Sequence, residues 1–90
     1  MSIKNHELKA DPEPFQASLW GWKLYEIRLD DRDFKMGEHI TLRETEYSAE
    51  EMATGKPLEY TGRCLGRVIT EVRTGYGLKD GYCIIGLDKL

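Results

Sequence analysis

The sequence lacks any long apolar run, and it has few cysteines. No apolar stretch approaches the ~20 residues that a helix needs to cross a bilayer, and the polar N-terminus does not resemble a signal peptide. We therefore expect a cytoplasmic protein with no membrane partner. The two cysteines, Cys64 and Cys83, lie far apart and form no CxxC motif, so reduced, half-buried thiols are expected rather than a disulfide.

The motifs of common cofactor sites are also missing. Gly75-x-Gly77 precedes no helix, so it is not a dinucleotide fingerprint, and the chain has no Gly-Lys-Ser/Thr of a phosphate loop. No Ser–His–Asp arrangement can be assembled. The soft metal ligands match no zinc spacing; they are His6, His39, Cys64 and Cys83. We expect neither a metal nor a cofactor.

Positive charge is not in excess either. The formal charge is −3 and the sequence pI is about 5.4, which argues against a protein that coats nucleic acid through bulk charge. A local basic pocket that reads one nucleotide is still compatible with this balance. Ninety residues with 40% hydrophobic and 32% charged content indicate a folded single domain over residues 1–90 with one core.

Hydrophobic periodicity predicts one helix and five strands. The helix begins at Asp11-Pro12, carries an apolar stripe of Phe15, Leu19 and Trp22, and ends at Gly21. The strands are expected over 3–9, 23–29, 39–46, 62–74 and 82–87, with Ile40 and Leu42 inward, and Val68, Thr70 and Val72 on one face. Residues 47–61 look like an excursion with one helical turn at 48–53. The fold class is α+β, a small curled sheet or barrel of about five mostly antiparallel strands.

The strand over 23–29 is unusually rich in charge. Glu26 and Arg28 share one face, ~6–7 Å apart at i and i+2, and Lys23 follows directly after the helix stop. Such a set can hold a polar, planar, partly anionic ligand such as a nucleotide. An exposed Glu–Arg ion pair explains the same pattern equally well. Arg32, in the turn that follows, is a further candidate ligand residue.

Aromatic residues and one histidine are further candidates for binding. Trp22 and Tyr82 are the stacking candidates among the aromatics, because both are expected at element ends near the charged strand, although the core is the default place for each. His6 is either a hydrogen-bonded strand histidine or a base, and it lies close to Lys9 in the sequence.

Several segments carry a recognisable pattern. They are His6-Glu7-Leu8-Lys9, Pro14-Phe15, Gly21-x-Lys23-x-x-Glu26-Ile27-Arg28, Asp31-Arg32-Asp33-Phe34-x-x-Gly37, Tyr60-Thr61-Gly62-Arg63 and Gly77-Leu78-Lys79-x-Gly81-Tyr82-x-Ile84-Ile85-Gly86. Together they resemble a bacterial and phage domain family of unknown function in the ASCH group, from residue 5 to residue 88. The resemblance implies a PUA-like fold, a small β-barrel with a helix beside a cleft, and binding of RNA or modified nucleosides.

One branch of the ASCH group hydrolyses the amide of acetylated cytidine. It uses a Lys at the position of Lys23, a Thr at the position of Glu26 and a distant Glu. This chain keeps the Lys and has Glu in place of the Thr.

Three hypotheses follow. The first is an RNA- or nucleotide-binding module with a cleft lined by Lys23, Glu26 and Arg28. Its further ligand residues are His6, Lys9, Arg32 and Tyr82. The second is a small amidohydrolase of modified nucleosides, with Lys23 and Glu26 as its catalytic residues. The third is a phage or host accessory protein that contacts another protein through residues 47–61.

Overall fold

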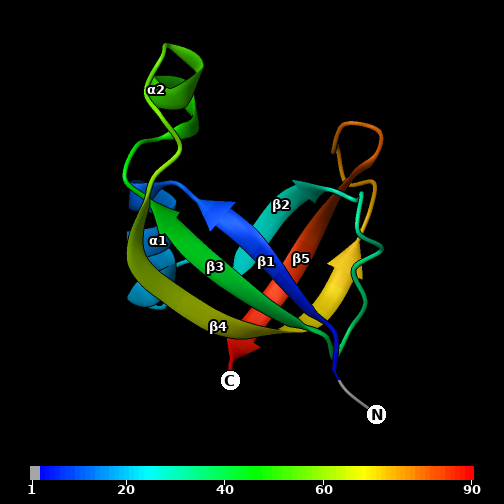
Figure 1. Ribbon diagram of the computed structural model, residues 1–90. Helices are drawn as coiled ribbons and strands as arrows, with labels where there is room; N and C mark the ends of the chain where they lie inside the picture. The colour runs from blue at the N-terminus through cyan, green and yellow to red at the C-terminus, as the bar shows by residue number, and fades with distance from the viewer. Residues whose placement is uncertain (1–2) are drawn as a thin grey trace.

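Five strands and two short helices form residues 3–90, the part of the chain that this computed structural model describes (Figure 1). The elements are β1 (Asn5–Ala10), α1 (Pro12–Leu19), β2 (Tyr25–Leu29), β3 (His39–Thr45), α2 (Ala49–Ala53), β4 (Tyr60–Arg73) and β5 (Tyr82–Lys89). Their order is the predicted one, and the helical turn expected at 48–53 is confirmed as α2. The strand expected over 3–9 begins only at Asn5, and the one expected over 23–29 begins only at Tyr25.

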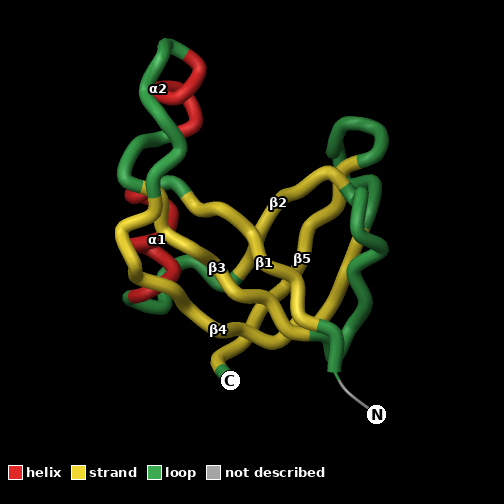
Figure 2. Tube along the Cα trace, in the orientation of Figure 1, coloured by secondary structure: helices red, strands yellow, loops and turns green. Residues whose placement is uncertain are grey.

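The five strands form one mixed sheet in the order β1-β3-β4-β5-β2. Only the β1–β3 pair is parallel, so the predicted mostly antiparallel sheet is confirmed. The sheet curls into a half-barrel, with β1 and β2 as its two outer strands (Figure 2). This small α+β barrel-like architecture is the predicted fold class.

The main helix is shorter than the sequence suggested. It buries Phe15 and Ser18, one turn apart, and ends at Leu19, which is 38% exposed. The chain then turns through Gly21 at a φ of +81°, a conformation that favours glycine, and this turn carries Trp22 to 77% exposure. The predicted stripe of Phe15, Leu19 and Trp22 is therefore wrong, because the helix stops before its third turn.

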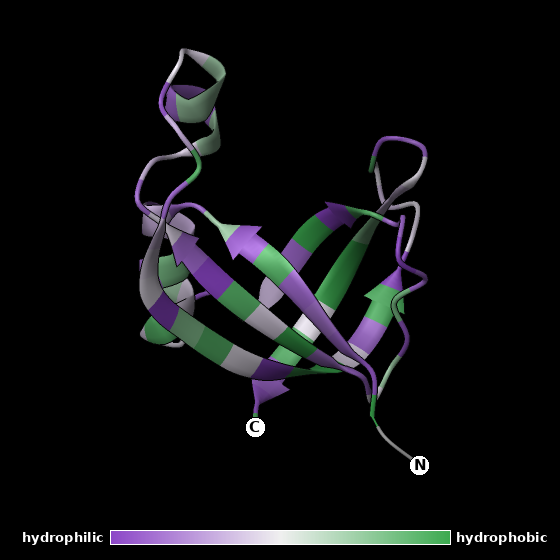
Figure 3. Cartoon of the chain, in the orientation of Figure 1, coloured by the Kyte–Doolittle hydropathy of each residue, from purple (hydrophilic) through white to green (hydrophobic). Residues whose placement is uncertain are grey.

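The core lies inside the curl of the sheet. Ile40 and Leu42 point inward as predicted, and both are fully buried. Alternation of polar and apolar residues along the strands is visible in Figure 3. In β4 the register shifts between Ile69 and Glu71, so Ile69 is buried, Thr70 is exposed and Val72 packs against the core. The single face predicted for Val68, Thr70 and Val72 is wrong because of this bulge.

Residues 47–59 leave the sheet as an excursion that contains α2 and projects beyond the strands (Figure 1). A capping box begins α2: the Ser48 hydroxyl accepts from Glu51 N, and the Glu51 carboxylate accepts from Ser48 N. The base of the excursion is closed by a 2.8 Å bond from Glu46 N to Glu59 O. Asp11 Oδ1 accepts from Ala49 N at 3.1 Å, which ties the excursion to the start of α1.

The structure also bears on the membrane and the cysteine expectations. No helix among residues 3–90 is long and apolar enough to cross a membrane. Both cysteines are free, as expected, but they are not half-buried: Cys64 is exposed and Cys83 is fully buried. Burial raises the pKa of the Cys83 thiol, helped by the nearby carboxylates of Asp30 and Asp31.

Candidate functional site

A cleft opens where the end of β1, the start of α1 and the inner face of β2 meet. Its volume is about 270 Å³. It is lined by Lys9, Ala10, Asp11, Pro14, Lys23, Glu26, Ile27 and Arg28. A space of this size lies just below the range of pockets that hold drug-sized ligands, so it suits a single base or nucleoside. The structure therefore brings four predicted site residues to one place.

Strand β2 turns its charged face toward the barrel interior. Glu26 is only 5% exposed, whereas its neighbours Tyr25 and Ile27 are 46% and 50% exposed. This reverses the usual arrangement, in which the apolar face of a half-buried strand covers the core. The sequence alternation alone could not show which face is inward, and the structure places the charges there.

The Glu26 carboxylate lies between two cations. Lys23 Nζ contacts Oε2 and also donates to Tyr25 O at 2.9 Å, and Arg28 donates to Oε1 from Nε at 3.0 Å and from Nη2 at 2.7 Å. We call Lys23, Glu26 and Arg28 the Glu26 network. The contact partners compensate the cost of burying the carboxylate. The alternative explanation from the sequence, an exposed Glu–Arg ion pair, is excluded because the Glu26 side chain is only 6% exposed.

The cleft presents more donors than acceptors. Glu26 already accepts three hydrogen bonds, whereas Arg28 Nη1 and Lys9 Nζ have no hydrogen-bond partner within residues 3–90. Free guanidinium and ammonium N–H groups suit carbonyl, carboxylate or phosphate oxygens. The chemistry of the cleft therefore favours a ligand that is rich in acceptor oxygens.

Two arginines connect the outer strands of the sheet. Arg28 Nη2 donates to Lys9 O at 2.6 Å, and Arg32 Nη1 donates to Glu7 O at 2.7 Å. Both carbonyls belong to β1, so these side chains span the seam that no backbone ladder closes. Arg32 does not line the cleft, and its observed contact connects this seam.

Two other predicted ligand residues lie away from the cleft. His6 is buried in β1, where its Nε2 is 2.8 Å from Glu38 Oε1 and its ring packs on Phe34. The hydrogen bond with His6 lowers the pKa of Glu38. Tyr82 pairs with Leu29 at the far end of β2 and lines a different hollow. The expected position of Tyr82 beside the charged pocket is therefore wrong.

Sequence reasoning missed a second buried carboxylate, Glu44 of β3. Arg63 donates to it from Nε at 2.9 Å and from Nη2 at 2.8 Å, and Thr61 Oγ1 donates at 2.7 Å. Hydrogen bonds from Arg63, with a smaller part from Thr61, hold the pKa of Glu44 below its usual value against the effect of burial. The same pair raises the pKa of Arg63. We call these three residues the Glu44 network.

A signal for Glu44 was present in the sequence. It stands two residues after Leu42, so the inward alternation of β3 continues directly to it. Its partner Arg63 belongs to the Thr61-Gly62-Arg63 segment, which the sequence comparison singled out without giving it a role.

The described residues hold no cluster of metal ligands. No three His, Cys, Asp or Glu side chains within residues 3–90 are placed to hold a metal ion.

Comparison with known proteins places the chain in a family. A family model described as "Domain of unknown function (DUF3850)" matches residues 5–87. The chain belongs to this family. No curated protein matches it significantly. The match covers the half-barrel up to residue 87 in β5 and includes both buried carboxylate networks, so this DUF3850 domain accounts for nearly all of the chain.

Proposed function

We propose that this DUF3850 protein is a binding module that holds a nucleotide, free or within RNA, in the cleft over the Glu26 network. The observation that carries the proposal is the buried carboxylate of Glu26, held between Lys23 and Arg28 on the inward face of β2 beside an open cleft. Buried ion pairs contribute little net stability compared with apolar residues of similar size. A role in ligand binding gives this costly arrangement a reason.

Size and hydrogen-bonding chemistry support a nucleotide. The cleft of about 270 Å³ accommodates one base. Lys9 and Arg28 can donate to phosphate or base carbonyl oxygens, and the remaining lone pairs of Glu26 can accept one amino or imino group. The earlier resemblance to the ASCH group implies the same class of ligand, and a half-barrel with a helix beside a cleft is compatible with it.

Calorimetric titration with uridine, uridine 5′-monophosphate and a hexameric oligouridine tests the proposal, with tryptophan fluorescence as a second readout. We expect binding that weakens with added salt, with a slope that corresponds to only a few phosphates. Lys9→Gln should weaken binding several-fold. Lys79→Gln, the matched control in the exposed 75–81 turn, should bind like the wild type. Absence of binding at low salt by the folded protein would contradict the proposal.

One observation also favours the amidohydrolase hypothesis. Lys23 Nζ contacts Glu26, and the Lys23 side chain borders both the cleft and the larger hollow beside it. A Lys–Glu pair in that position can move a proton during amide hydrolysis. Hydrolysis of N4-acetylcytidine to cytidine and acetate, measured for the wild type and Lys23→Ala, tests this activity. No turnover, or equal turnover by both, removes it.

A further inference from the structure

An exposed groove lies beside α1. Trp20 and Trp22 border it with 58% and 77% of their surface exposed. Their rings pack edge to face, with 4.8 Å between the ring centroids. Glu13, Gln16 and Ala17 of α1 complete its lining, and its volume is about 290 Å³. Large aromatic side chains are enriched at protein interfaces, and an exposed pair of them marks this groove as a contact surface.

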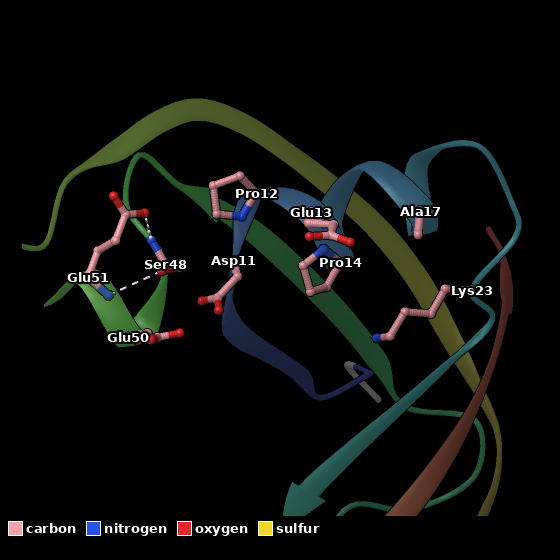
Figure 4. A pocket seen from close by; sticks show the side chains of 9 residues that line it. All are labelled: Asp11, Pro12, Glu13, Pro14, Ala17, Lys23, Ser48, Glu50 and Glu51. Atoms are coloured by element: carbon pink, nitrogen blue, oxygen red, sulfur yellow. Dashed lines mark hydrogen bonds between the residues drawn. The ribbon is translucent and has the colours of Figure 1, made fainter. Parts of the chain in front are cut away.

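The groove adjoins the larger hollow whose lining residues are shown in Figure 4. That hollow has a volume of about 650 Å³ and shares Glu13 and Ala17 with the tryptophan groove. Its walls come from the start of α1 and from the excursion, which contributes Ser48, Glu50 and Glu51. We call these two adjoining spaces together the Trp–acid groove.

The charge of the Trp–acid groove is strongly one-sided. It is lined by the carboxylates of Asp11, Glu13, Glu50 and Glu51. Within residues 3–90, none of these four forms an ion pair with Lys, Arg or His. Lys23 is the one cation in the lining, and Glu26 already pairs with it.

This combination fits a cationic partner. The faces of tryptophan rings attract ammonium and guanidinium groups, and a neighbouring carboxylate such as Glu13 strengthens that attraction. A polyanion would be repelled by the same lining. A bare metal ion is disfavoured because no three suitable ligands converge within the described residues.

We propose that the Trp–acid groove docks a basic peptide segment of a partner protein. One Arg or Lys side chain of the segment lies against the Trp20–Trp22 pair and Glu13. Further basic side chains reach Glu50 and Glu51 on the excursion. The Trp–acid groove adjoins the nucleotide cleft, with which it shares Asp11, Pro14 and Lys23, but the Trp20–Trp22 pair and Glu13 do not line the cleft. The proposal does not depend on the function proposed for that cleft.

A fluorescein-labelled peptide with four arginines separated by glycine and serine is a suitable probe, measured by fluorescence anisotropy. Trp22→Ala and Glu13→Gln should each weaken its binding about tenfold, which corresponds to ~1.4 kcal/mol. The matched controls are Tyr76→Ala, an aromatic residue that is 75% exposed elsewhere, and Asp80→Asn, an acid in a different hollow. Both controls should bind the peptide like the wild type.

The controls separate a built site from general attraction to an acidic protein. If Asp80→Asn weakens binding as much as Glu13→Gln, the attraction is non-specific and the proposal fails. If hexameric oligouridine displaces the peptide, and Trp22→Ala weakens the binding of that RNA, the groove binds nucleic acid and the proposal is again overturned. The Trp22 side chain is largely exposed, and Glu13→Gln conserves the shape of the side chain. Both variants should therefore stay folded, and a loss of peptide binding would come from the groove and not from unfolding.

Discussion

Glu26 and Glu44 are two buried carboxylates with arginine partners, yet their surroundings differ. Arg63 of the Glu44 network also donates to Gln16 and lies over the Phe15 ring, so it fastens β4 to α1. Neither Glu44 nor Arg63 lines the cleft or the Trp–acid groove. Glu26 instead borders open space, and Arg28 beside it keeps free N–H groups. A buried ion pair is a candidate site only when accessible space and unused donors accompany it.

The largest expected difference between the two networks is in stability. Arg28→Ala leaves Lys23 on Glu26 and should cost about 1–2 kcal/mol of unfolding free energy. Arg63→Ala leaves Glu44 with Thr61 as its remaining side-chain partner, so we expect a larger loss. Urea denaturation measures both. Arg73→Ala, in a half-exposed pair with Glu71, is the control and should change little. A greater loss for Arg28→Ala than for Arg63→Ala would reverse the comparison.

Ligand affinity should depend on the Glu26 network and not on the Glu44 network, the reverse of the order expected for stability. Arg28→Lys keeps the charge but loses the free Nη1 amino group of the guanidinium in the cleft. The affinity for uridine 5′-monophosphate should therefore fall about tenfold, or ~1.4 kcal/mol. Arg63→Lys should leave that affinity unchanged, because its guanidinium faces Glu44 and α1. Calorimetry provides the measurement. Equal effects of the two substitutions would mean that the cleft is not where the nucleotide binds.

The Glu44 network should also contribute to acid sensitivity. The folded-state pKa of Glu44 lies below its ordinary value of 4.5 because Arg63 donates to it. Its stabilising contribution is therefore complete above about pH 4.5 and is lost as the pH falls through the lower folded value. Melting temperatures from pH 7 to pH 3 should fall less steeply for Arg63→Ala than for the wild type. Parallel curves would show that other carboxylates, such as Glu38, dominate the acid response.

The smallest expected effect concerns the hydroxyl that only the Glu44 network has. Thr61→Val removes the 2.7 Å bond to Oε1 while keeping the branched shape, and should cost about 0.5–1 kcal/mol. Differential scanning calorimetry can detect this loss. A destabilisation as large as that of Arg63→Ala would show that Thr61, rather than Arg63, is the main partner.

The sequence predicted the local features well. Alternation placed Ile40 and Leu42 inward, and the expected helical turn at 48–53 is present as α2. The gathering of Lys23, Glu26 and Arg28 followed from strand geometry and the helix stop, since these residues are neighbours in the chain.

Features that depend on distant contacts could not be predicted in the same way. The partnership of Glu44 with Arg63 joins two strands, and the bond from Arg28 to Lys9 O crosses the seam of the sheet. The bulge between Ile69 and Glu71 could not be predicted from the hydrophobic pattern of β4. The exposure of Trp22 depends on the residue at which α1 ends, and element ends are the least certain part of any periodicity argument.

The excursion leaves and rejoins the sheet at one place, which makes this segment replaceable. Because Glu46 N meets Glu59 O at the sheet, the residues between them can lengthen, shorten or change without altering a strand register. The entropic cost of a longer loop grows only with the logarithm of its length. One wall of the Trp–acid groove can therefore diverge between members of the family while the cleft beneath it stays the same. In a redesigned protein, exchanging residues 47–58 would change the partner and keep the barrel.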